Sequence, residues 1–148
     1  MLEKDFKLTD LKEVADQLLS LARKSNLNQA TILTFSGDLG AGKTTITQEI
    51  AKSLGVKDKV ISPTFVIMKI YRTKDKKFTN LIHIDAYRLS KGGELMTLGF
   101  GEMIKDKSNL IIIEWPEIVA DIIPEEGVFK LELSHKNEST RSLKFWYN

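Results

Sequence analysis

The segment from Gly37 to Thr44, which reads GDLGAGKT, limits the folds open to this chain more than any other part of the sequence. It meets the pattern G-x-x-x-x-G-K-[ST] at every fixed position. The run before it, Ala30 to Phe35, is rich in β-branched and aromatic residues and is typical of a buried strand. The run after it, Lys43 to Leu54, repeats apolar residues at helical spacing, and Gly55 favours the end of that helix. A chance glycine-rich turn is the alternative, and it would need both the pattern and its strand–helix context to be accidental.

A loop of this kind binds the phosphates of a nucleoside triphosphate, and its residue types explain how. Glycine adopts the main-chain angles that turn successive N–H groups toward an anion, and it leaves no side chain in the way. Lys43 would supply a positive charge to the β- and γ-phosphates, and the hydroxyl of Thr44 would bind a magnesium ion. The helix that follows would direct its positive N-terminal end at the phosphates. The residues predicted to contact the nucleotide are Asp38, Leu39, Gly40, Ala41, Gly42, Lys43, Thr44 and Thr45.

A magnesium site beside such a loop also needs a carboxylate at the end of a hydrophobic strand. Glu114 follows the fully apolar run Leu110 to Ile113, as expected of a central strand. Asp85 follows an alternating run, in which His83 and Asp85 share one face. We assign Glu114 to the magnesium ion and Asp85 to the γ-phosphate side, as a water-orienting group or a group that meets the metal through water. The reverse assignment stays open, as does the interpretation of Asp85 as a surface carboxylate at a strand end.

The rest of the chain mixes helices with short strands. A helix is predicted from Asp10, because Asp10 and Glu13 have capping-box spacing and apolar residues follow at helical intervals. Residues 90–101 are expected to form a loop with one helical turn at 94–98, and a short helix is expected at 116–119. Strands are predicted at 64–71, 78–85, 110–113, 128–133 and 142–147, and residues 4–8 form either a short edge strand or a leader before the first helix. This order indicates an α/β fold of the three-layer P-loop NTPase kind, with a mixed central sheet flanked by helices and with C-terminal antiparallel strands, in one domain over residues 1–148.

Composition and charge narrow the cellular setting. The chain has no cysteine, which excludes disulfides and thiolate zinc sites and fits a reducing compartment. The N-terminus is too charged for a signal peptide and the longest apolar run is too short to span a bilayer, so we expect a cytoplasmic protein without membrane contact. The net charge of +2 neither requires nor excludes nucleic acid.

Four residues near the predicted site have both a functional and a structural interpretation. The hydroxyl of Thr64 could meet phosphate or a magnesium-bound water, although Ser-Pro-Thr is also a common turn composition. Arg88 could clamp phosphate or lie on the surface. Trp115 could stack on a base or be buried at a strand end. For His83 we expect a structural partner rather than a base.

Five motifs, in their order and spacing, resemble the bacterial TsaE (YjeE) family. They are GDLGAGKTT from residue 37, SPTF at 62–65, HIDAYRL at 83–89, EL and LG within 94–99, and EWPE at 114–117. The phosphate loop alone is unspecific, whereas the other blocks together with it are highly specific. The resemblance extends from the first helix to the terminal strands, which is nearly the whole chain.

This resemblance implies an ATPase that uses ATP and Mg²⁺ and supports formation of threonylcarbamoyladenosine in tRNA. It implies action with the TsaB and TsaD proteins, with tRNA contacted indirectly or weakly, and a chain that alone is a monomer or weak oligomer. By position, Lys43 and Asp85 take catalytic roles, and Thr44 and Glu114 take the magnesium roles. Thr9 and Arg141 match places where the family closes on the nucleotide.

One departure from the family pattern is Lys91-Gly92-Gly93, where the family usually has a more acidic, helical lead into Glu94. Glycines at this point could loosen the segment that follows Asp85. The departure does not touch the phosphate loop.

Two other functions stay open at this point. A small-molecule or nucleoside kinase would use the same loop but usually has an arginine-bearing lid, and the four arginines of this chain are not clustered. A GTPase would need the guanine-reading motif N-K-x-D, which the sequence lacks. For the ATPase we expect slow hydrolysis by the isolated chain, because no arginine finger is evident.

Overall fold

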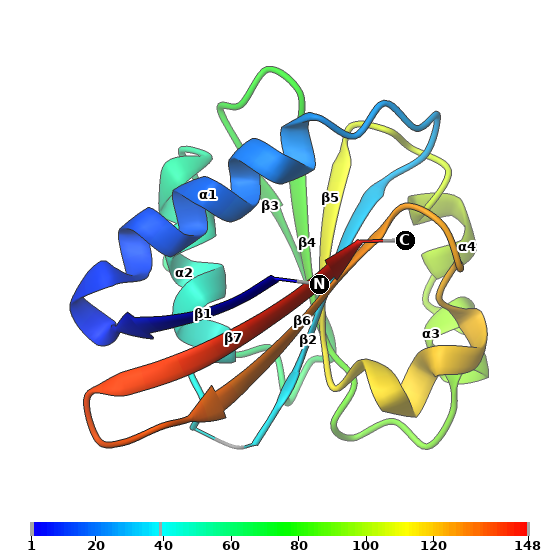
Figure 1. Ribbon diagram of the computed structural model, residues 1–148. Coiled ribbons are helices and arrows are strands. Elements are labelled where there is room, and N and C mark those ends of the chain that lie inside the picture. The colour runs from blue at the N-terminus through cyan, green and yellow to red at the C-terminus, as the bar shows by residue number, and fades with distance from the viewer. Residues whose placement is uncertain (1, 39, 148) are drawn as a thin grey trace.

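The computed structural model describes residues 2–38 and 40–147, which form one seven-stranded sheet with helices on both faces (Figure 1). The strand order across the sheet is β1-β7-β6-β2-β5-β4-β3. The strands are β1 (Leu2–Lys7), β2 (Thr31–Gly37), β3 (Met68–Arg72), β4 (Asn80–Asp85), β5 (Asn109–Glu114), β6 (Val128–His135) and β7 (Thr140–Tyr147). Strand β2, which leads into the phosphate loop, lies in the middle of this order.

The sheet is mixed, as the sequence predicted. Strands β6, β2, β5 and β4 run parallel to one another, whereas β3 pairs antiparallel with β4 at one side, and β7 with β6 and β1 with β7 at the other. Every residue of β5 is buried, which fits its apolar sequence and its central place between two other strands. The predicted antiparallel pair at the C-terminus is formed by β6 and β7.

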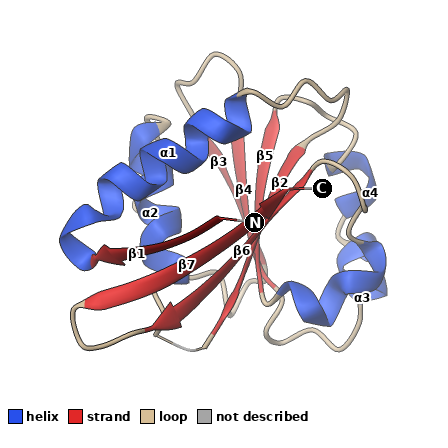
Figure 2. Cartoon of the chain, viewed as in Figure 1, coloured by secondary structure: helices blue, strands red, loops and turns tan. Residues whose placement is uncertain are grey.

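Two helical layers cover the faces of the sheet (Figures 1 and 2). The helices α1 (Leu11–Arg23) and α2 (Lys43–Ser53) lie on one face. The helices α3 (Gly92–Thr97) and α4 (Phe100–Met103) and the 3-10 helix η2 (Pro116–Ile122) lie on the other, and a second 3-10 helix, η1 (Leu8–Asp10), precedes α1. The three-layer α/β fold is therefore confirmed. No helix of the described residues is long and apolar enough to cross a membrane.

The alternation of side chains along the central strands divides the core between the two faces. In β5, Leu110 and Ile112 belong to the cluster that packs against α1 and α2. Ile111 and Ile113 belong to the cluster that packs against α3, α4 and η2. A strand that is apolar on both faces can only be buried on both faces, and this explains why the run LIII forms the centre of the fold.

Parallel strands end at the same edge of the sheet, and this places the predicted site. Strands β2, β5 and β4 end at Gly37, Glu114 and Asp85, and the last two residues are paired across the β4–β5 register. The β6–β7 hairpin, residues 136–139, lies at the same edge because β6 ends there and β7 begins there. Ligands of open α/β sheets bind beyond the carboxyl ends of parallel strands, so this edge is the expected position of a ligand site.

Two local predictions near the starts of elements differ from the structure. The strand expected at 64–71 begins only at Met68, because the carbonyl of Pro63 accepts hydrogen bonds from Val66 and Ile67 and turns the chain, with Ile67 at a φ of 68°. Asp10 lies at the N-cap position of α1, as predicted, but its carboxylate makes no capping hydrogen bond there: it accepts one from the main-chain N–H of Lys7, 3.1 Å away, and so closes η1 instead.

The segment 90–101 is more helical than predicted. It forms α3 and α4 instead of a loop with one helical turn. Gly92 is buried at the start of α3, and a Cβ built there would lie 2.5 Å from Asp121 and 2.6 Å from Ile122 of η2. This glycine permits close packing of α3 on η2, so in the structure it tightens the segment that the sequence suggested it would loosen.

Candidate functional site

The loop between β2 and α2 has the backbone that its glycines predict. Gly37, Gly40 and Gly42 have positive φ values of 134°, 77° and 104°. At Gly37 a Cβ would lie 2.1 Å from the carbonyl oxygen of Leu133 in β6, so the close approach of the two strands excludes any side chain. Leu39, which was predicted to contact the nucleotide, lies outside the described residues.

Lys43 is the first residue of α2, and its ammonium is held inside the loop. The residue is only 5% exposed. Its Nζ donates a hydrogen bond to the carbonyl oxygen of Gly37 at 2.6 Å and lies 3.8 Å from the ring centroid of Trp115. Burial lowers the pKa of Lys43, and this shift is opposed by the carboxylates of Glu114, Glu117, Asp85 and Asp38. The Lys43 ammonium is therefore largely removed from water and already lies within the loop.

Thr44 and Glu114 meet beside that lysine. The Thr44 hydroxyl donates to the Glu114 carboxylate, with Oγ1 3.2 Å from Oε1 and 3.4 Å from Oε2. Glu114 is 3% exposed, and its Oε2 lies 2.5 Å from Nε2 of His83. The structure thus brings the predicted metal pair into contact and adds His83, which was expected to be a structural partner only.

Asp85 lies next to Glu114 in the sheet but has a separate set of partners. Its Oδ2 accepts a hydrogen bond from the Thr64 hydroxyl at 2.7 Å and one from Ser62 at 3.5 Å. Its Oδ1 accepts one from the main-chain N–H of Tyr87 at 3.0 Å. The Ser62 and Thr64 hydroxyls therefore face a carboxylate. Asp85 is 4% exposed, so it is not a surface carboxylate at a strand end.

The chemistry of these groups fits magnesium. Hydroxyl and carboxylate oxygens are the donors this ion prefers, and it commonly keeps several waters and substrate phosphates as its remaining ligands. Within residues 2–38 and 40–147 no group of three or more histidines, aspartates or glutamates is arranged to hold a metal by itself. Thr44 and Glu114 can thus form only part of a coordination shell. Because Glu114 contacts Thr44, the geometry favours Glu114 over Asp85 as the metal carboxylate.

The three remaining predicted contacts lie at the same edge of the sheet. Thr9 is exposed in η1, and the adjacent Leu8 donates a main-chain hydrogen bond to Ser139 of the β6–β7 hairpin. Arg141 is 8% exposed, and its Nη1 donates to main-chain carbonyls of residues 137, 138 and 140 in that hairpin. Thr45 is exposed on α2. Thr9 and Arg141 therefore lie beyond β6, across the loop from Asp85, and their contact with a nucleotide stays a prediction.

The sequence argument missed two contacts of the site. It placed His83 and Asp85 on one face of a strand but did not pair His83 with Glu114, although adjacent parallel strands bring such positions together. It considered phosphate as the partner of Thr64 and did not consider Asp85. The contact of His83 with Glu114 could have been inferred from the residue spacing. The contact of Thr64 with Asp85 depends on the turn at Pro63, which the sequence did not predict.

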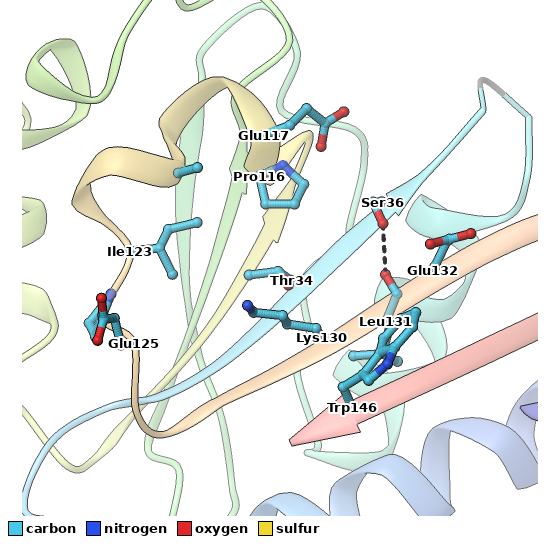
Figure 3. Close-up of a pocket in the computed structure, with 12 residues that line it drawn as sticks. Thr34, Ser36, Pro116, Glu117, Ile123, Glu125, Lys130, Leu131, Glu132 and Trp146 are labelled. Atoms are coloured by element: carbon cyan, nitrogen blue, oxygen red, sulfur yellow. Dashed lines mark hydrogen bonds between the residues drawn. The ribbon is translucent and has the colours of Figure 1, made fainter. Parts of the chain in front are cut away.

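A separate groove of about 620 Å³ lies between η2 and the strands β2, β6 and β7 (Figure 3). Pro116 and Ile123 line it from η2 and the chain after it, and Thr34, Lys130 and Trp146 line it from β2, β6 and β7. Of the loop residues that the structure describes, 37, 38 and 40–44, none lines it. Ser36, which precedes the loop, also lines the groove, and its hydroxyl donates to the carbonyl of Leu131; among the described residues, no predicted site residue lines it.

A three-layer α/β fold with a glycine-rich loop, a lysine and a threonine between a central strand and the next helix defines a P-loop protein. A family model described as threonylcarbamoyl adenosine biosynthesis protein TsaE matches residues 7–143. The chain belongs to this TsaE family.

Individual relatives support the same family membership. The tRNA threonylcarbamoyladenosine biosynthesis protein TsaE of Rickettsia typhi is 38% identical over 121 residues, which cover 80% of this chain and 81% of that protein. The protein of the same name from Rickettsia felis is 40% identical over 134 residues, which cover 89% of this chain and 75% of that protein. The crystal structure of YdiB from Bacillus subtilis superposes with a TM-score of 0.69 at 27% identity, covering 98% of this chain and 86% of that one.

Proposed function

We propose that this chain is the ATP-binding and ATP-hydrolysing subunit for threonylcarbamoyladenosine modification of tRNA. Family membership supports the pathway. The observation that carries the ATPase proposal is the convergence of Lys43, Thr44, Glu114 and Asp85 at one edge of the sheet. These side chains supply the cation, the hydroxyl and the two carboxylates that phosphoryl transfer to water needs.

Each of these residues has a distinct part in the proposed reaction. Lys43 exchanges the Gly37 carbonyl for phosphate oxygens and neutralises charge that develops on them. Thr44 and Glu114 would hold Mg²⁺, which would supply positive charge to the phosphates. Asp85 keeps a water in line for attack, because Thr64 and the N–H of Tyr87 fix its carboxylate.

The isolated chain should hydrolyse ATP slowly, because each of the four guanidinium groups already has a partner other than the phosphate loop. Arg23 pairs with Asp75 at 2.7 Å, and Arg72 donates to Asn80. Arg88 lies 4.3 Å from the ring centroid of Phe65, and Arg141 serves the β6–β7 hairpin. In many phosphate-transferring proteins an arginine from a partner stabilises the transition state. We therefore propose that TsaB and TsaD act on this chain in the cytoplasm, and that tRNA is reached through them.

The test is a hydrolysis assay with and without the cognate TsaB and TsaD chains. We expect slow release of inorganic phosphate by the chain alone, acceleration in the complex, and co-purification that depends on ATP. Asp85→Asn should slow the release by roughly 10²- to 10⁴-fold in both settings while nucleotide binding persists. Glu117→Gln is the control, because Glu117 is an exposed carboxylate near Lys43 that makes no contact with Thr44.

The same assay separates the other functions. Labelled phosphate that appears on a small acceptor instead of in inorganic phosphate would identify a kinase and contradict the proposal. Tighter binding of GTP than of ATP in competition would identify a guanine nucleotide switch. No acceleration and no association with TsaB and TsaD would contradict the proposed partnership and leave the nucleotide site standing.

A further inference from the structure

His83 is a fully buried polar side chain to which the proposed reaction assigns no part. Its exposed fraction is 0%, and its ring makes a polar contact with Glu114, 2.5 Å from Nε2 to Oε2. The other ring nitrogen, Nδ1, is buried without a hydrogen-bond partner among the described residues. An aliphatic side chain would fill this position without leaving a polar nitrogen desolvated. The contact with Glu114 is therefore the property that distinguishes histidine here.

The sheet register brings the two side chains together. In the parallel pair of β4 and β5, His83 lies opposite Ile112 and Asp85 lies opposite Glu114. Alternate residues of a strand share a face, so His83 lies on the same face as Asp85 and its partner Glu114. His83 is therefore the diagonal neighbour of Glu114, two residues before Asp85 on the adjacent strand. Leu81 and Ile112 on this face belong to the core cluster that packs against α2, the helix that carries Thr44.

Thr44 from α2 and His83 from β4 thus both contact the carboxylate of Glu114. An ionised carboxylate only accepts hydrogen bonds, so such a Glu114 pairs with the His83 tautomer that carries its hydrogen on Nε2. The nearer oxygen to the Thr44 hydroxyl is Oε1, at 3.2 Å. His83 from β4 therefore occupies Oε2, and Oε1 is left toward the loop.

We propose that His83 is a positioning residue for magnesium: it fixes the Glu114 carboxylate so that Oε1 stays available to the ion or to a water bound to it. This inference rests on the proposed function, because it assumes that Glu114 serves the metal. Groups that hold a metal ligand by hydrogen bonding commonly change metal affinity by about 10- to 100-fold when they are removed. His83 would act in this way although it touches neither the metal nor the nucleotide.

The test compares nucleotide binding with and without magnesium in three variants. Isothermal titration calorimetry gives the Kd of a non-hydrolysable ATP analogue in excess Mg²⁺ and in EDTA, and the ratio of the two measures the contribution of the metal. His83→Leu should reduce this ratio by about tenfold or more and leave the Kd in EDTA unchanged. His83→Gln should keep most of the ratio, because its amide N–H can reach Glu114. Leu81→Ala is the control for a weakened core, because Leu81 is buried on the same face of β4.

Each outcome decides one question. If the ratio for His83→Leu equals that of the wild-type protein, the positioning role is wrong while the proposed function stands. If Leu81→Ala lowers the ratio as much, the effect belongs to the core and the positioning role is again wrong. If the wild-type protein does not bind the analogue at all, the proposed function itself fails. If His83→Leu does not fold, His83→Asn makes the same comparison with His83→Gln, because the shorter amide cannot reach Glu114 and should lose the ratio.

Discussion

The substitution Lys43→Met separates binding from folding at the centre of the site. Methionine keeps the length and the apolar stem of lysine but removes the ammonium that donates to Gly37 and lies over Trp115. Lys43 is 5% exposed and burial lowers its pKa, so the charge is costly to the folded protein when no ligand is bound. We therefore expect the ligand-free variant to melt at or above the wild-type temperature.

The loss of ATP binding can be worked out from the hydrogen bonds involved. At an ATP concentration about 100 times Kd, binding adds about 2.7 kcal/mol to the wild-type free energy of unfolding. Two charge-assisted hydrogen bonds from the ammonium to phosphate contribute about 1.5 kcal/mol each, so their loss raises Kd about 150-fold. The same ATP concentration then adds only about 0.3 kcal/mol to the variant. At roughly 2–4 °C per kcal/mol, the increase in melting temperature falls from about 5–11 °C to about 1 °C.

Thermal denaturation with and without Mg²⁺–ATP measures both effects. Lys52→Met is the matched control, because Lys52 lies on the same helix with its side chain 73% exposed and paired with Glu49. The control should keep the full wild-type increase. A Lys43→Met protein that also keeps it would refute the assignment of Lys43 to the phosphates.

The remaining predictions concern backbone fit, hydrolysis and pH. Gly37→Ala should lower the free energy of unfolding by about 2–4 kcal/mol in chemical denaturation, because the added Cβ meets the Leu133 carbonyl at 2.1 Å at a positive φ; Gly93→Ala, whose Cβ would meet only Lys91 at 3.9 Å, should be neutral or stabilising. Asp85→Asn should slow ATP hydrolysis by roughly 10²- to 10⁴-fold while the Kd for ATP changes little, and a loss of binding instead would place Asp85 among the ligand contacts. In the folded chain the pKa of Lys43 is below its ordinary 10.5, so between the lowered pKa and 10.5 the unfolded chain binds more protons, and the stability that Lys43 contributes should rise with pH in that window. In denaturant titrations from neutral to alkaline pH, the wild-type protein should therefore gain stability relative to Lys43→Met. A constant difference between the two proteins would contradict a lowered pKa.

The parts of the fold that follow from local pattern were predictable. The loop motif, the apolar run before Glu114 and the alternation of the last two strands gave the three layers, the mixed sheet and the C-terminal antiparallel pair. Each of these patterns is formed by residues close together in the sequence, and each is of the kind expected for the layer in which its segment lies.

The elements that sequence reasoning missed depend on contacts between distant residues. The turn before β3 forms because Pro63 accepts main-chain hydrogen bonds while Thr64 reaches Asp85, 21 residues away in the sequence. The start of α3 at Gly92 depends on the close approach of η2, and no pattern in the residues around Gly92 predicts that contact. Within the site, the positions of Thr44 and Glu114 followed from the fold class, whereas the contact of His83 with Glu114 needed the strand register.

The crystal structure of the protein with Mg²⁺ and a non-hydrolysable ATP analogue would test the central claim most directly. The account predicts the β- and γ-phosphates within the loop, the Lys43 ammonium moved from the Gly37 carbonyl to phosphate oxygen, and the ion at the Thr44 hydroxyl beside Glu114. An analogue bound elsewhere, for example in the groove between η2 and β6, with the Lys43 ammonium still on Gly37, would contradict it.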